Sequence, residues 1–406
     1  MDMDFIAKRD FSKLIAQSGA MFQIIKELKK EDFFGTSPPS VFVGSNFYPN
    51  LNVGILSPPA ETQDAWIHDA PNFWSEQDFT IKQIALLRSA LINSRFNVNI
   101  KDVRKEGKFL DKAKEIGIAK KPVDVEIKLN KAPEIRFDFE KITMPMGPRA
   151  SLKQITITEN VKVDNKVEKV VNDVDLKSSD ALNYLYENGF DENTLTKLLS
   201  IGLLGLKKNR KLVPTRWSIT ATDDTLGKNL IGYMKDYKLI EDYQLYTGSY
   251  LGNYYYILMF PEVWQYELFE GYLPRSLWNL DEGIKFATDS ETMFGRKAYA
   301  NNTVGGYYSS RLSMLEHLAK IKKQASCLVI RFETPEYNMP LGVFVVRNAA
   351  RKTLANNPLK FESKEALLEK TKELIKNKFN YNISNVYKQS KLLRSLTQSK
   401  LFHFFN

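Results

Sequence analysis

Apolar residues recur at steps of three and four along several stretches of the chain, which is the spacing of one face of an α-helix. This spacing predicts an amphipathic helix over residues 5–30. A second helix is predicted over 81–93, with Thr80 as its N-cap and Arg88 off the apolar stripe. Further helices are predicted over 179–188, 192–201 (capped by Asp191), 225–236 (capped by Asp223), 309–323 and 364–378 (capped by Ser363).

Other stretches alternate between apolar and polar residues, which is typical of half-buried β-strands. Residues 123–129 alternate in this way, and Ile135, Phe137 and Phe139 repeat the pattern. Two short apolar runs at 41–43 and 51–56 flank a Tyr-Pro-Asn turn and predict a hairpin. Strands are also predicted over 155–163, in the valine-rich segment after 166, and over 217–221, 254–260, 327–332 and 342–347.

Strand and helix patterns follow one another without a regular βαβ rhythm. The pattern therefore predicts an α+β (irregular α/β) fold, with mixed sheets and flanking helices. The aromatic-rich stretch 262–300 is expected to be largely loop. A polar break at 380–385 precedes a flexible C-terminal tail.

Composition narrows the functional classes. With one cysteine among 406 residues, an internal disulfide and a multi-cysteine zinc site are excluded, and three histidines argue against a histidine-rich metal site. No run of about 18 apolar residues exists, so no transmembrane helix and no membrane partner are expected. The acidic start, Met-Asp-Met-Asp, is unlike a secretory signal, so a cytoplasmic location is expected.

The net charge of +10 is concentrated near the C-terminus. Residues 341–406 contain 13 Lys or Arg and four Glu. A basic end of this kind indicates a polyanion or an acidic partner surface, and a solvated helix face explains it equally well. The stretch 207–211 is a second basic segment, and abundant Tyr and Phe could stack on unpaired bases, so DNA is an expected partner.

The last nine residues carry the spacing Q-x-x-L-x-x-F-F, formed by Gln398, Leu401, Phe404 and Phe405. This spacing resembles a PIP box, the short peptide that client proteins insert into the sliding clamp PCNA. One helical turn places the leucine and the first phenylalanine on one face, and the rings form a compact apolar anchor. The alternative is that the tail packs its aromatic rings on its own core.

Several longer motifs, in this order, resemble the archaeal Nre family: SPPSVFVG, YPNLNVGILSPP, PTRWSITATDD, GGYYSSRLSMLEHL and PLGVFVVRNAARK. The resemblance implies a role in DNA repair and a C-terminal PCNA-binding peptide. It also implies three parts, an N-terminal-type domain at 1–265, a C-terminal-type domain at 266–385 and a basic tail at 386–406. Many members carry an N-terminal cysteine cluster that this chain lacks, so no zinc is expected.

Asp223 and Asp224 are the candidate catalytic and metal-binding residues. At a predicted strand–helix junction, two carboxylates could hold Mg²⁺ or Mn²⁺ against a phosphate, with Arg216 as an anion clamp. The alternative is structural, with Asp223 as a helix cap and Asp224 as a partner of the helix dipole.

Four other residues are candidates for binding the phosphate of a nucleic acid or nucleotide. Gly305 and Gly306 precede a predicted helix that includes Arg311, so backbone N–H groups there could approach a phosphate. The segment lacks the lysine of a P-loop, and a plain helix start fits it as well. Arg149, in a predicted rigid loop, could contact a backbone phosphate or simply lie at the surface.

Three functions remain open from the sequence. The first is a DNA repair factor that PCNA recruits through the C-terminal peptide. The second is a metal- or nucleotide-dependent phosphoryl-transfer enzyme, nuclease-like, acting on DNA. The third is a non-catalytic adaptor that bridges the clamp to other repair proteins.

Overall fold

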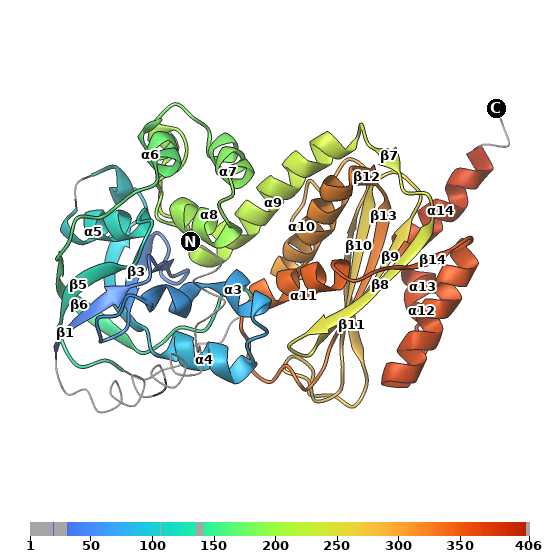
Figure 1. The fold of residues 1–406 in the computed structure, drawn as a ribbon, viewed down its shortest axis with the longest axis horizontal. Coiled ribbons are helices and arrows are strands. Elements are labelled where there is room, and N and C mark those ends of the chain that lie inside the picture. The colour runs from blue at the N-terminus through green and yellow to red at the C-terminus, as the bar shows by residue number, and fades with distance from the viewer. Residues whose placement is uncertain (1–18, 20–30, 106, 135–140, 403–406) are drawn as a thin grey trace. The chain divides into compact units, whose positions relative to one another are not determined.

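The computed structural model describes residue 19 and residues 31–105, 107–134 and 141–402. For residues 398–402 it describes the backbone alone. The helix predicted over 5–30 and the strand predicted around Phe137 lie outside these residues. The chain divides into two compact units, Met1–Thr222 and Asp223–Asn406, called here the first and second units (Figure 1). Helices and mixed sheets occur in both, which confirms the α+β prediction.

The first unit is built on a six-stranded sheet in the order β1-β5-β6-β4-β3-β2. All pairs are antiparallel except β4 with β6. The hairpin predicted between residues 41 and 56 is confirmed, as Val41 pairs with Ile55 and Val43 with Val53. The strands are β1 (Asp32–Ser37), β2 (Val41–Val43), β3 (Asn50–Ser57), β4 (Ile92–Asn99), β5 (Val123–Leu129) and β6 (Arg149–Ile157).

Helices of the first unit surround this sheet, and α5 and α8 contact its strands. The predicted helices near 179–188 and 192–201 are confirmed, and the Asp191 side chain accepts a bond from the Thr194 N–H at 2.7 Å. The valine-rich segment after residue 166 is a helix and not a strand, because Val167 and Val170 are buried at helical spacing. The helices are α3 (Pro71–Glu76), α4 (Ile81–Ser89), α5 (Lys108–Gly117), α6 (Asn165–Asn172), α7 (Ser178–Glu187) and α8 (Glu192–Ser200), with short 3₁₀ turns η1 (Ala65–Asp69), η2 (Asp102–Arg104) and η3 (Lys207–Asn209).

Helix α4 begins with the predicted cap at Thr80 and ends at Ser89, four residues earlier than predicted. The expectation that Arg88 lies off the buried stripe is wrong, because its side chain is buried. Its Nη1 donates to Asp69 Oδ1 at 2.8 Å and its Nε to the Pro145 carbonyl at 3.0 Å. An arginine can occupy a buried position when its donors are satisfied in this way.

Helix α9 (Thr215–Met234) replaces the strand predicted over 217–221. Ser218, Thr222 and Leu226 are buried four residues apart, so helical spacing governs the packing. The strand prediction rests on the alternation of Trp217, Ile219 and Ala221 with polar residues. The helix spans the residues at which the two compact units divide.

The second unit contains a six-stranded mixed sheet in the order β11-β10-β13-β9-β8-β14. The strands predicted near 254–260 and 327–332 are confirmed as β9 and β13. The stretch 262–300, expected to be largely loop, contributes β10 and β11. The strands are β8 (Tyr243–Tyr250), β9 (Asn253–Phe260), β10 (Gln265–Tyr272), β11 (Lys285–Glu291), β13 (Ser326–Glu333) and β14 (Leu359–Phe361), with β7 (Lys238–Leu239) and β12 (Lys323–Gln324) forming a separate pair.

Helices cover both faces of this sheet. Helices α10 and α11 lie on one face, and α12, α13 and α14 lie on the other (Figure 1). The strand predicted over 342–347 is wrong, since Phe344 begins a helix whose first seven residues are all buried. A short run that is apolar on all sides does not distinguish a strand from a helix. The helices are α10 (Val304–Ile321), α11 (Phe344–Leu354), α12 (Lys364–Phe379), α13 (Ser384–Gln389) and α14 (Lys391–Phe402).

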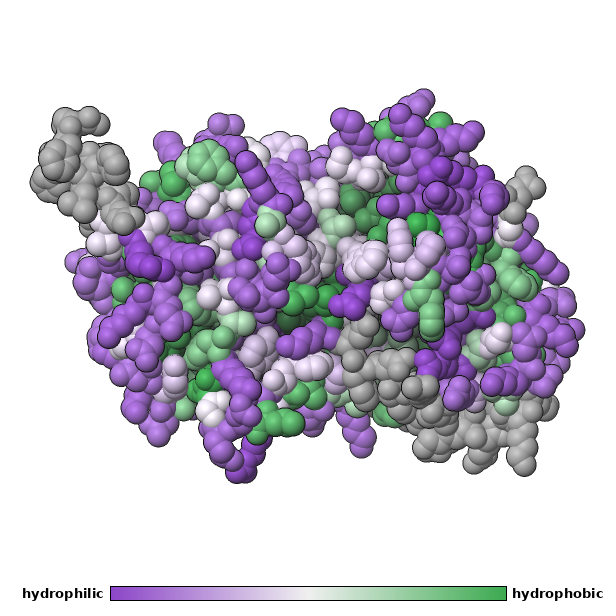
Figure 2. Space-filling view, turned by 180° about the vertical axis from the view of Figure 1, so that it is seen from behind, coloured by the Kyte–Doolittle hydropathy of each residue, from purple (hydrophilic) through white to green (hydrophobic). Residues whose placement is uncertain are grey.

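Among the described residues, no helix is both long enough and apolar enough to span a membrane. Figure 2 shows hydrophilic residues over most of one face of the molecule, with hydrophobic residues visible in small separate areas.

Candidate functional site

The C-terminal segment begins as a packed helix rather than as a flexible tail. Residues of α14 form part of the apolar core beneath the sheet of the second unit, together with Val386 of α13. Leu392, Leu393 and Leu396 are at most 8% exposed. The basic segment predicted from residue 386 onward therefore starts inside the folded body.

Glu267 of β10 holds the first turn of α14. Its side chain is buried and accepts the Ser390 hydroxyl at 2.5 Å and the backbone N–H groups of Lys391 and Leu392 at 3.0 Å each. A carboxylate at a helix N-terminus satisfies orphan donors and opposes the positive end of the helix dipole. This residue fixes where the C-terminal helix leaves the sheet.

Two of the four PIP-box candidates, Gln398 and Leu401, lie within α14. Their side chains, and the whole of Phe404 and Phe405, lie outside the described residues. The use of this peptide as a clamp ligand stays a prediction. What the structure adds is the position of its base, two residues past the buried Leu396.

Asp223 and Asp224 lie in the middle of α9, and not at a strand–helix junction or a helix N-cap. Asp223 is fully buried. Nη2 of Arg347 donates to its two oxygens at 2.7 and 2.6 Å, and the Ser309 hydroxyl donates to it at 2.7 Å. This carboxylate joins α9 to α10 and α11 as a buried ion pair.

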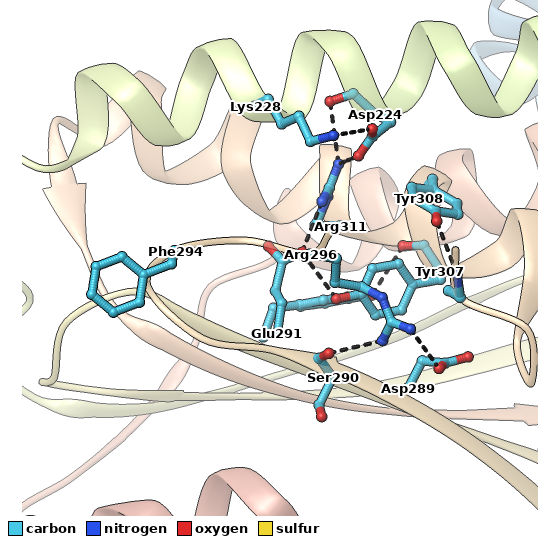
Figure 3. A network of polar contacts seen from close by, with 12 residues as sticks. Asp224, Lys228, Asp289, Ser290, Glu291, Phe294, Arg296, Tyr307, Tyr308 and Arg311 are labelled. Carbon is cyan, nitrogen blue, oxygen red and sulfur yellow. Dashed lines mark hydrogen bonds and ion pairs between the residues drawn. The ribbon is translucent and has the colours of Figure 1, made fainter. Parts of the chain in front are cut away.

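Asp224 belongs to a second set of contacts, drawn in Figure 3. Its two oxygens accept from Nη2 of Arg311 at 2.7 Å and from Nζ of Lys228 at 2.6 Å. The other terminal nitrogen of Arg311 donates to Glu291 at 2.8 Å, and the same glutamate oxygen accepts the Tyr307 hydroxyl at 3.0 Å (Figure 3). Arg311 is 0% exposed, so it serves as an internal partner of carboxylates and not as a surface phosphate ligand.

These charges shift the pKa values of their neighbours. Burial by itself lowers the pKa of the Arg311 guanidinium, but the charges of Glu291 and Asp224 outweigh burial and raise it. Burial, followed by the Glu291 charge, raises the pKa of the Tyr307 hydroxyl well above its ordinary value. Both groups therefore keep their protons, which is the property of a structural network rather than of a proton-transfer site.

Gly305 and Gly306 lie inside the first turn of α10 and not in a loop that precedes it. A Cβ on Gly306 would come within 2.5 Å of Glu270 Oε1. That glutamate, on β10, accepts from Arg331 of β13 at 2.5 Å. The absence of a side chain at Gly306 therefore allows α10 to approach a buried ion pair on the sheet. This close approach explains the glycine at position 306 without a phosphate ligand.

The remaining arginine candidates lie elsewhere. Arg149 is the first residue of β6, half-buried, and its backbone exchanges hydrogen bonds with Glu134. Arg216 is in the first turn of α9, seven residues before Asp223, which is about 10 Å along the helix axis. The structure thus brings Asp224, which is half-buried, onto the buried Arg311, and the neighbouring Asp223 onto Arg347, so each carboxylate has a cation as partner.

Across the described residues, no group of three or more His, Cys, Asp or Glu is arranged to hold a metal ion. Cys327 is buried, and burial raises the pKa of its thiol. The charged partners that complete the network, Arg347, Glu291 and Arg331, were absent from the sequence-based candidates. A charged residue within an otherwise apolar run, such as Arg331 in β13, is the signal that could have identified them.

Comparisons with known proteins show which protein family the chain belongs to. A family model described as archaeal Nre, N-terminal, matches residues 7–279, and one described as archaeal Nre, C-terminal, matches residues 291–404. The chain belongs to the archaeal Nre family. Its relatives include the DNA repair protein NreA of Haloferax volcanii, 37% identical over 79% of this chain and 78% of that protein. The DNA repair protein NreB of Archaeoglobus fulgidus is 36% identical over 92% of each chain.

No solved structure matches this Nre chain. The segment between the two family models, residues 280–290, lies within the second unit and contains most of β11, which pairs with β10. The two family segments are therefore different from the two compact units. The division predicted at residue 265 concerns the family segments and stays a prediction.

Proposed function

We propose that this Nre protein is a DNA repair factor that the sliding clamp PCNA recruits through Gln398, Leu401, Phe404 and Phe405. The observation that carries the proposal is the Q-x-x-L-x-x-F-F spacing at the end of a chain whose relatives are named DNA repair proteins. Two aromatic rings and one aliphatic side chain form the kind of anchor that dominates small interfaces.

The geometry of α14 supports recruitment at a defined distance. Glu267 and three buried leucines hold the base of the helix on the sheet. Gln398 follows Leu396 by two residues, about 3 Å along a helix axis. A clamp that bound the peptide would hold the folded body close, because no long linker separates them.

A pull-down with the cognate clamp tests the proposal. We expect the Phe404→Ala/Phe405→Ala double variant to lose binding, since each ring of such an anchor contributes roughly 2–4 kcal/mol. Phe402→Ala is the matched control, because it removes a ring from the same segment at a position outside the motif. Equal capture of the double variant and the wild-type protein would refute the clamp assignment.

A phosphoryl-transfer function has no observation in its favour, since Arg347 and Arg311 account for the two candidate carboxylates. A clamp-bound adaptor without DNA contact would share the C-terminal peptide. Direct binding of DNA by the folded body distinguishes a repair factor that touches its substrate from such an adaptor.

A further inference from the structure

Three large aromatic side chains are exposed close together on the first unit. Phe47 and Tyr48 lie in the loop between β2 and β3 and are 76% and 50% exposed, and Trp217 at the start of α9 is 48% exposed. The rings of Tyr48 and Trp217 are in contact, with centroids 5.8 Å apart and planes tilted by 47°. Such a group on a soluble protein marks a binding surface.

Backbone hydrogen bonds hold the segments that carry these rings. The Ile100 N–H, at the end of β4, donates to the Pro49 carbonyl at 3.0 Å. The Leu212 N–H then donates to the Ile100 carbonyl at 3.0 Å, and the Val43 N–H donates to the Thr215 hydroxyl at 2.9 Å. The loop after β2, the end of β4 and the segment before α9 are therefore neighbours.

The same segments are strongly basic. Residues 100–104 and 207–217 contain seven Lys or Arg and one acidic residue, Asp102, which pairs with Lys105. Lys101 and Lys211 are exposed and directly flank the Ile100–Leu212 hydrogen bond. The exposed Arg104 donates through Nε to the Arg210 carbonyl at 3.0 Å, which ties η2 to the 207–211 segment.

The cations around the rings remain available to a ligand. Within the described part of the chain, the exposed Lys101 and Lys211, which flank the Ile100–Leu212 hydrogen bond, form no ion pair with a carboxylate. Arg210 differs, because its guanidinium donates to the backbone carbonyls of Gly205 and Val171 and serves the fold. The surface therefore combines aromatic rings with unpaired positive charge.

We propose that this ring surface, formed by Phe47, Tyr48 and Trp217 with the lysines beside them, binds single-stranded DNA. Unpaired bases present a free face for stacking on aromatic rings, whereas the bases of a duplex are already stacked on each other. The lysines lie where phosphates of the same strand would pass. The choice of DNA over RNA rests on the proposed repair function, while the surface itself is independent of the clamp peptide.

The backbone conformation of Phe47 also supports a role in ligand binding. Its φ is +66°, a left-handed backbone that is uncommon for a bulky residue, and its ring is the most exposed of the three. A ring in this position contributes almost nothing to the core. Contact with a ligand gives a reason for phenylalanine there, where folding favours glycine or asparagine.

Fluorescence anisotropy of the full-length protein with a labelled oligothymidylate tests the proposal. We expect salt-sensitive binding, which Phe47→Ala and Trp217→Ala each weaken about tenfold. Lys211→Gln should reduce the slope of log K against log salt by about 0.7. Phe34→Ala is the matched control, since Phe34 is 55% exposed on β1, at the opposite edge of the same sheet from β2, and should leave affinity unchanged.

Tryptophan emission gives a direct readout of stacking. The oligonucleotide should quench Trp217 on binding, and Trp217→Phe should keep the affinity while it removes the quenching. Melting curves confirm that each variant is folded. Wild-type affinity in both alanine variants, equal weakening by Phe34→Ala, or no binding by the wild-type protein would each overturn the proposal. Clamp capture of Phe47→Ala should stay at the wild-type level, so failure here is distinct from failure of the clamp proposal.

Discussion

Replacing Glu267 with alanine should release the C-terminal helix from the body while the rest of the second unit stays folded. This single side chain accepts the Ser390 hydroxyl and the first two N–H groups of α14. Among the described residues, Glu267 is the acceptor for both of those N–H groups. Glu267→Ala leaves three donors unsatisfied against the sheet, and they regain water only if the helix undocks.

The size of the effect depends on how closely the burial of apolar side chains in α14 and the entropy cost of ordering its backbone cancel. Burial of Leu392, Leu393 and Leu396 stabilises the docked helix by about 5–9 kcal/mol, at about 1.5–3 kcal/mol per side chain. Ordering the backbone over 391–396 costs about 6–12 kcal/mol, at about 1–2 kcal/mol per residue. The balance is near zero, so the bonds to Glu267, worth about 3 kcal/mol together, decide whether α14 is docked.

Hydrogen–deuterium exchange measures this directly. A loss of about 3 kcal/mol should speed exchange of the amides over 391–396 about 100-fold, since 1.4 kcal/mol is a factor of ten. Glu267→Gln keeps the shape and one acceptor oxygen, so it should give an intermediate rate. Ser363→Ala is the control, because it removes the cap of α12 and should affect only the first turn of that helix. Unchanged protection over 391–396 in Glu267→Ala would refute the reasoning.

Three further changes test the interior. Gly306→Ala should destabilise the protein in urea by several kcal/mol, because its Cβ would meet a carboxylate oxygen at 2.5 Å, whereas Gly232→Ala, with open space, should stabilise it by up to about 1 kcal/mol. Arg347→Met should cost about 3–5 kcal/mol by removing the arginine cation that pairs with the buried Asp223, and an added Asp223→Leu should restore most of that loss in urea melts. Burial lowers the pKa of His68 from 6.5 to about 4, so the folded protein disfavours the protonated ring and its stability should fall by about 3 kcal/mol as the pH is lowered from 6.5 to 4. His68→Phe should remove this part of the dependence of stability on pH, and an unchanged dependence would contradict the assignment.

Sequence reasoning succeeded where the deciding contacts are local. The hairpin of β2 and β3 follows from two apolar runs and a turn, and the caps at Thr80, Asp191 and Ser363 each bond within three residues. Signals of this kind lie within one window of the chain. The α+β class follows from them without knowledge of tertiary packing.

The errors arose where distant residues decide the structure. The segment 217–221 alternates between apolar and polar residues, which predicts a strand, yet Ser218 and Thr222 are buried four residues apart on one side of a helix. Glycine at 306 suggested a phosphate loop, while its cause is a glutamate of β10. Glu267 itself gave no local signal, because its partners, Ser390 and the first two residues of α14, lie 123 to 125 residues away.

The same limit applies to the candidate site. Asp223 and Asp224 attracted attention as adjacent carboxylates, and their cations, Arg347 and Arg311, lie 124 and 87 residues further along the chain. Aspartates without a cation nearby in the sequence can therefore form ion pairs with arginines that the fold brings to them. The exposed rings of the first unit show the converse, since Tyr48 and Trp217 meet only through tertiary structure.

The two proposals have a quantitative consequence when they are taken together. A body tethered to a clamp that already encircles DNA experiences an effective DNA concentration in the millimolar range. Where the clamp-loaded DNA carries a single-stranded stretch, a ring surface with micromolar affinity would then be well occupied, whereas it would be almost empty on dilute DNA without the clamp. Substitutions at Phe47 should therefore have small effects in clamp-loaded assays and large effects in solution. The Phe404→Ala/Phe405→Ala variant should reverse that order, since it removes the tether and leaves the ring surface intact.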